Sequence, residues 1–135
     1  MYWLSHHPET ELDRCYRIGG FHVCARCLGT YPTMFLAIAL QLKFRAPLEH
    51  PYDLYAVIAL TLPSTIDWAI GRFDPHRFSN AWRTGTGILL GLALGRSLFI
   101  HLQRPFPPVF LAQGIVVTAV ALPVILASYR RKGRR

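Results

Sequence analysis

The chain has 135 residues, of which 52% are hydrophobic and only 16% carry a charge. An average soluble domain has about a quarter charged residues, so this composition excludes an ordinary water-soluble surface and points to lipid. A net charge of +8 could indicate nucleic-acid binding, but the basic residues gather beside apolar runs, as they do where membrane proteins meet the cytoplasm. We therefore expect membrane lipids as partners and no specific nucleic acid.

The first 27 residues form a polar segment that is rich in cysteine and histidine. The whole chain has three cysteines, an odd number that argues against a complete disulfide framework. We treat residues 1–27 as a separate N-terminal segment because an apolar run begins at Leu28.

Four apolar stretches follow, at residues 28–43, 54–71, 85–102 and 109–129. About 20 helical residues cross a hydrocarbon core, and spanning segments must be helical because lipid offers the backbone no hydrogen-bond partners. The prediction is an all-α integral membrane protein with a four-helix bundle over 28–129 and a basic tail over 130–135. A soluble helical bundle is the alternative, but it needs polar faces that the last two stretches lack.

The basic residues also predict an orientation. With four spans, the N-terminal segment, the link between the second and third spans, and the tail share one side of the membrane. That side carries eleven basic residues against three in the other two links, an imbalance that marks it as cytoplasmic. We predict a multi-pass protein of the inner (plasma) membrane with both termini in the cytoplasm. The eleven are Arg14, Arg17, Arg26, Arg72, Arg77, Arg83, Arg130, Arg131, Lys132, Arg134 and Arg135.

Glycines recur every four residues in the third stretch, at Gly87, Gly91 and Gly95. Such a stripe of small residues lets another helix backbone approach closely. Packing within the bundle is the favoured interpretation. The alternative is association into a homo-oligomer or a larger membrane complex.

The N-terminal segment contains a candidate zinc site. Cys24 and Cys27 form a C-x-x-C pair that can bind one ion from a single turn, and His6 and His7 can complete a tetrahedral set. Cys15, His22 or His76 could supply a missing ligand. The pattern leaves open whether the zinc is structural or catalytic.

A redox function is the second interpretation of the same thiols. Near Arg26 and a helix start, Cys24 and Cys27 would have a lowered pKa, which favours thiol exchange with a quinone as electron acceptor. The cytosol is reducing, however, and no second cysteine pair is present to relay electrons. In the third interpretation, Cys24 and Cys27 are small buried residues that take part in no chemistry.

A second group of polar residues surrounds the middle link. Asp67 lies inside the second span, and ionisable residues in membrane segments are functional candidates. Asn80 and Arg83 come where the third helix begins, and a helix start with an arginine suits an anion such as phosphate. The structural alternative pairs Asp67 with Arg83 and uses Asn80 as a helix cap.

The motifs LSHHP, DRCYRIGGFHVCARCLGTY, IDWAIGR and SNAWRTGTGILLG resemble a family of small predicted integral membrane proteins of unknown function, over residues 4–91. The resemblance implies no established activity. Many relatives have threonine where this chain has Cys15, which argues against Cys15 as an essential ligand. The residues that match the family's characteristic positions are His6, His7, Cys24, Cys27, Gly29, Asp67, Asn80, Arg83 and Gly87.

The leading hypothesis is a zinc-binding membrane protein, with zinc on His6, His7, Cys24 and Cys27. A polar site of Asp67, Asn80 and Arg83 at the cytoplasmic interface would then act as a hydrolase or transferase on a lipid-like or anionic substrate. One rival is a non-enzymatic, zinc-stabilised membrane assembly module. The other is a thiol-disulfide oxidoreductase that uses the C-x-x-C pair with a quinone.

Overall fold

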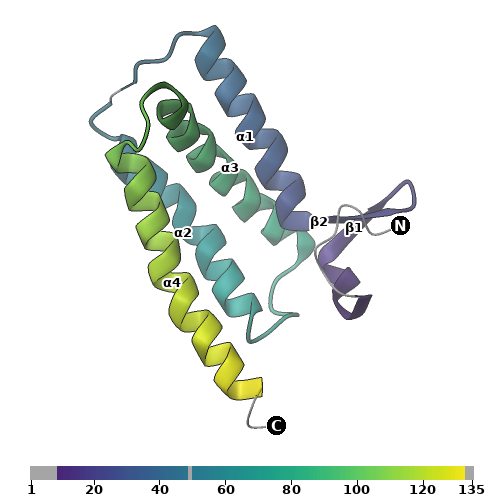
Figure 1. Cartoon of the computed structure of the whole chain (residues 1–135). Coiled ribbons are helices and arrows are strands. Elements are labelled where there is room, and N and C mark those ends of the chain that lie inside the picture. Colours follow the sequence, from purple (N-terminus) through teal and green to yellow (C-terminus); the bar gives the residue numbers. More distant parts are fainter. Residues whose placement is uncertain (1–8, 49, 133–135) are drawn as a thin grey trace.

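The computed structural model describes residues 9–48 and 50–132 (Figure 1). A short 3-10 helix, η1 (Glu9–Arg14), leads into two strands, β1 (Cys15–Ile18) and β2 (Phe21–Cys24). Four α-helices follow in this part of the chain: α1 (Ala25–Lys43), α2 (Asp53–Gly71), α3 (Asn80–Gln103) and α4 (Pro108–Lys132). Each of the four apolar stretches therefore lies within one helix.

Three of these helices, α2, α3 and α4, are long and apolar enough to cross a membrane. The first stretch, 28–43, forms α1 but does not reach the same hydropathy over a full span. Its helix includes Arg26 and Lys43 as well as several threonine, proline and glutamine residues. The helical, multi-span character is confirmed, and the fourth span stays a prediction.

The expectation of an all-α chain is wrong in the N-terminal segment, where β1 and β2 form an antiparallel hairpin. The turn consists of Gly19 and Gly20, which both adopt positive φ angles of 54° and 86°. A two-residue turn with both residues in this region twists in the sense that a hairpin requires, and glycine adopts it without strain. The helix then begins directly at Ala25, so Cys27 already lies in its first turn.

The glycine stripe of α3 packs against α1, as predicted for contacts within the bundle. A Cβ atom on Gly87 would lie 2.5 Å from the Arg26 carbonyl oxygen, and one on Gly95 would lie 2.6 Å from Ala37 Cβ. Gly91, between these two glycines, meets Thr30, which lies between Arg26 and Ala37. Later residues of α3 therefore contact later residues of α1, so the two helices run parallel. Only glycine allows the backbones to approach this closely.

Helix α4 is held to the bundle by a buried polar side chain. Gln113 Nε2 donates to Thr61 Oγ1 of α2 over 2.9 Å, and Gln113 Oε1 accepts from Ser97 Oγ of α3 over 2.5 Å. All three residues are buried, whereas most of α4 is exposed at the bundle surface. Where lipid surrounds a helix, such hydrogen bonds contribute about 0.6 kcal/mol on average and fix its position.

The helices alternate in direction, so the links fall at two opposite ends of the bundle (Figure 1). The hairpin, the α2–α3 link and the last turn of α4 lie at one end, which we call the hairpin end. The α1–α2 and α3–α4 links lie at the other. This arrangement brings together the three segments that the charge count assigned to one side of the membrane.

Candidate functional site

An ion pair between Arg26 and Asp67 lies at the hairpin end. Arg26 Nη2 and Nε both donate to Asp67 Oδ2, with the Nε bond at 3.1 Å. Asp67 is only 2% exposed. Its second oxygen, Oδ1, is buried and accepts no hydrogen bond from the residues that the structure describes. A buried carboxylate is stable only when it is paired, which explains the arginine.

The structural alternative, in which Asp67 pairs with Arg83, is therefore not the arrangement that the structure adopts. Arg83 is 6% exposed and donates from Nη2 to the Pro75 carbonyl oxygen over 2.5 Å. Its Nη1 donates weakly to Asn80 Oδ1, at 3.4 Å. Arg26 reaches Asp67 from the start of α1, whereas the Arg83 side chain is hydrogen-bonded to the α2–α3 link.

Asn80 does not cap α3 either. The cap is Ser79, whose Oγ accepts from the backbone N–H of Trp82 over 3.2 Å. Asn80 Nδ2 instead donates to the Asp13 carbonyl oxygen over 2.8 Å. Asn80 thus joins the start of α3 to the N-terminal segment, with its Oδ1 turned to Arg83.

Several charged side chains act on Arg83. The cations among them are Arg14 and Arg26, and the carboxylates are Asp67 and Asp13. Arg14 Nη2 is held in place by the Gly71 carbonyl oxygen at 2.8 Å. Arg83 forms no ion pair with a carboxylate of the described residues, so its guanidinium group is available to bind an additional anion.

The three thiols gather where the hairpin meets α1. Cys15 stands directly opposite Cys24 in the strand register, and both are buried. None of the three is in a disulfide. A hydrogen bond with Cys24, together with burial, raises the pKa of the Cys27 thiol. This direction is opposite to the one that the redox interpretation assumed, because the neighbouring thiols and burial outweigh Arg26.

Within residues 9–48 and 50–132, no three cysteine, histidine, aspartate or glutamate side chains converge as a metal site requires. His6 and His7 lie outside the described residues, so the proposed zinc set is not tested. Of the suggested substitute ligands, His76 is directed elsewhere: its Nδ1 lies 3.1 Å from Asp13 Oδ2 and its side chain is 79% exposed. His22 pairs with Arg17 in the hairpin register.

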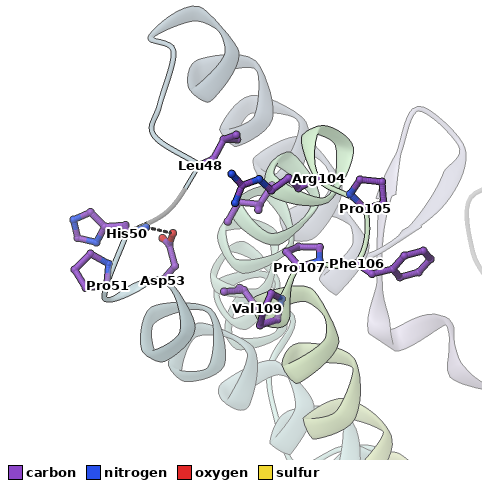
Figure 2. A pocket seen from close by; sticks show the side chains of 11 residues that line it. Leu48, His50, Pro51, Asp53, Arg104, Pro105, Phe106, Pro107 and Val109 are labelled. Atoms are coloured by element: carbon purple, nitrogen blue, oxygen red, sulfur yellow. Dashed lines mark hydrogen bonds between the residues drawn. The ribbon is translucent and has the colours of Figure 1, made fainter.

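The opposite end of the bundle contains a pocket of about 710 Å³ between the two links. Figure 2 shows His50, Pro51 and Asp53 on one side of it and residues 104–109 on the other. Asp53 is already engaged there, because Arg96 donates to it from Nε over 2.8 Å and from Nη2 over 2.5 Å. This ion pair ties α2 to α3, and we assign it a structural role.

Comparison with known proteins places the chain in a family. Residues 9–97 match the model of a family described as "Predicted membrane protein (DUF2085)". The chain belongs to the DUF2085 family. No curated protein and no solved structure matches it. The matched region of this DUF2085 protein covers the hairpin, α1, α2 and most of α3, and so includes all of Cys24, Cys27, Arg26, Asp67 and Arg83.

Arg26 is the residue that sequence reasoning missed in this DUF2085 chain. From the sequence it is interpreted as a cytoplasmic charge and as a cation near the two thiols, although its place between Cys24 and Cys27 also puts it at the start of an apolar helix. A carboxylate inside a span needs a cation at the same depth, and the predicted cytoplasmic side offers several arginines for that role. The sequence contains no signal that selects between it and Arg83, because the choice depends on how α1 and α3 are rotated against α2.

Proposed function

We propose that this DUF2085 protein binds an anionic, lipid-like molecule at the hairpin end of its bundle and hydrolyses it or transfers its head group. The observation that carries the proposal is the buried Arg26–Asp67 pair with Arg83 close by. Arg83 forms no ion pair with the described residues, and Asp67 retains an oxygen without a hydrogen bond from them.

Each residue has a distinct role in this proposal. Arg83 binds the anionic group, and Asn80 holds the Arg83 side chain toward the site. Arg26 holds one oxygen of Asp67 by hydrogen bonds and an ion pair. The other oxygen accepts the proton of the attacking water or hydroxyl group, so that Asp67 acts as general base.

The same proposal includes the membrane topology. Helix α1 joins α2, α3 and α4 as a fourth span, because it runs parallel to α3 along the glycine stripe. The hairpin end faces the cytoplasm of a cell whose inner (plasma) membrane holds the protein, as the basic residues indicate. Asp67 and its neighbours then meet substrates that arrive through the cytoplasmic leaflet.

Binding of lipids to the purified full-length protein tests the proposal. Phosphatidic acid should bind roughly tenfold more tightly than phosphatidylcholine with the same chains, measured by native mass spectrometry from detergent. Arg83→Gln should remove most of that preference because it deletes the anion-binding cation. Arg83→Lys keeps the positive charge and should retain part of the preference for phosphatidic acid.

Arg77 supplies the matched control, since it is an exposed arginine of the same link. Arg77→Gln should leave the preference for phosphatidic acid unchanged. Equal affinity for the two lipids in the unaltered protein contradicts the proposal. So does an Arg83→Gln protein that elutes as a single folded species and keeps the full preference.

Zinc at Cys24, Cys27, His6 and His7 is the second part of the proposal. Its support is the contact between the Cys24 and Cys27 thiols at the start of α1. Two thiolates held by one helical turn are half of a tetrahedral zinc site, and the histidines would supply the other half. Bound zinc would close the N-terminal segment onto the bundle and, with an open coordination position, polarise a substrate oxygen.

Metal analysis of the detergent-purified protein tests this part. We expect one zinc per chain by inductively coupled plasma mass spectrometry, and loss of it in the Cys24→Ala, Cys27→Ala double variant. Cys15→Ala is the matched control and should retain zinc. A metal-free protein with thiols that oxidise reversibly as a pair would support the oxidoreductase instead. Stoichiometric zinc without any lipid preference would support the assembly module.

A further inference from the structure

A cavity of about 570 Å³ opens beside the candidate site, between α2, α3 and α4. Its lining is mainly apolar and includes Leu90 and Leu94 of α3 and Val117 of α4. Arg26 and Trp68 also line it, so the cavity extends to the residue that pairs with Asp67. A cavity with an apolar body and one guanidinium group matches an amphipathic ligand with an anionic head.

The cavity is long enough for a lipid chain. On α4 its lining extends from Phe110 to Ala121, and eleven residues of helix rise by about 16 Å. That length is roughly half of a hydrocarbon core of about 30 Å, or one leaflet. A chain from a single leaflet could therefore lie along α4 with its head group near Arg26.

Gly114 leaves the middle of this cavity open. It belongs to the lining, and a Cβ atom at this position would meet nothing within 4 Å. It differs in this respect from Gly87, Gly91 and Gly95 of α3, where a Cβ would overlap α1. Helix packing thus does not require glycine at position 114. The lack of a side chain there leaves space in the cavity.

We propose that the cavity between α2, α3 and α4 holds the acyl or isoprenoid chain of the substrate, with the anionic head group at Arg26 and Arg83. This inference rests on the proposed function and specifies its substrate class as a membrane lipid with at least one long apolar chain. Buried Gln113 is one of the polar residues of the wall, and its hydrogen bonds hold α4 to α2 and α3 beside the cavity.

Photo-cross-linking with defined probes tests the inference. The full-length protein is placed in phosphatidylcholine vesicles that contain a phosphatidic acid with a diazirine in one acyl chain. After irradiation, mass spectrometry should find adducts on cavity-lining residues such as Leu90, Leu94 and Val117. Gly114→Leu adds a side chain at a position where a Cβ atom meets nothing within 4 Å, and by occupying part of the cavity it should lower the adduct yield roughly tenfold.

Ala119→Leu is the matched control, because it adds a leucine to an exposed position of the same helix that does not line the cavity. It should leave the yield unchanged. Equal yields in the Gly114→Leu and Ala119→Leu proteins, or adducts only on lipid-facing residues, would overturn the inference. Both variants should first be shown to elute and unfold like the unaltered protein.

A second probe separates this inference from the proposed function. A phosphatidylcholine with the same diazirine chain should label the cavity far less. If both probes label it equally, Gly114→Leu blocks both, and Arg83→Gln changes neither, the chain site stands and head-group recognition fails. If phosphatidic acid still binds through Arg83 but Gly114→Leu has no effect, the chain site fails and the proposed function stands.

Discussion

Replacing Arg26 with glutamine is expected to lower the free energy of unfolding by about 3 kcal/mol or more. The variant leaves Asp67 buried without its ion-pair partner, and desolvating an unpaired carboxylate is among the most destabilising single changes in a protein. Chemical denaturation of the protein in detergent micelles measures the change. Arg26→Lys retains a positive charge but not the two N–H donors, Nε and Nη2, that bind Asp67. It should lower the free energy of unfolding by less than Arg26→Gln does.

Replacing Asp67 should lower the free energy of unfolding by less than replacing Arg26 does, because the two partners are buried unequally. The Arg26 side chain is 23% exposed and that of Asp67 is 1% exposed, so Arg26 can turn toward water when Asp67 becomes asparagine. We expect Asp67→Asn to cost about 1 kcal/mol. The double variant Arg26→Gln, Asp67→Asn should be more stable than Arg26→Gln alone, because it no longer buries an unpaired charge. A double variant that is less stable than Arg26→Gln would refute this account of the pair.

Substituting leucine for Gly91 is expected to prevent α1 from packing on α3. A Cβ atom there would lie 2.5 Å from the Thr30 carbonyl oxygen and 2.9 Å from Thr33 Cβ, and a backbone oxygen cannot turn aside as a flexible side chain can. Even Gly91→Ala should cost about 1–3 kcal/mol, the usual range for overpacking. For Gly91→Leu we expect aggregation or a broad elution profile in size-exclusion chromatography.

Gly85 provides the matched control within the same helix. It lies off the stripe, and a Cβ atom at its position would meet nothing within 4 Å. Gly85→Ala and Gly85→Leu should leave the protein monodisperse and can raise stability by up to about 1 kcal/mol, because glycine is a poor helix former. If Gly91→Leu and Gly85→Leu behaved alike, the close contact between α1 and α3 would not be a source of stability.

The helices could be predicted from the sequence because long apolar runs leave few alternatives in a membrane protein. The stretch predicted at 54–71 corresponds to Asp53–Gly71, and the one at 109–129 to Pro108–Lys132, so the differences are confined to a few residues at the helix ends. The role of Gly87, Gly91 and Gly95 could be predicted for the same reason, since a four-residue spacing places them on one face of any α-helix. Local pattern was sufficient for these features.

The hairpin and the ion pair depend on information that a local pattern lacks. Each strand has only four residues, which is too short for an alternation to stand out, although Gly19 and Gly20 are a turn signal. The partner of Asp67 depends on the rotation of α1 relative to α2, which packing across the bundle determines. For this reason Asp67 could be identified as a candidate, whereas the choice of Arg26 required the structure. His6 and His7 stay predictions outside the described residues.

The double-glycine turn determines the pairing of side chains at the base of the hairpin. Ile18 faces Phe21 at the turn, and counting outward from this pair brings Cys15 opposite Cys24. A slip of one residue would rotate every side chain of one strand to the other face and place Tyr16 beside Cys24. Two residues that have no side chains, and that touch none of the sulfurs, therefore govern which atoms become neighbours of the Cys24 sulfur.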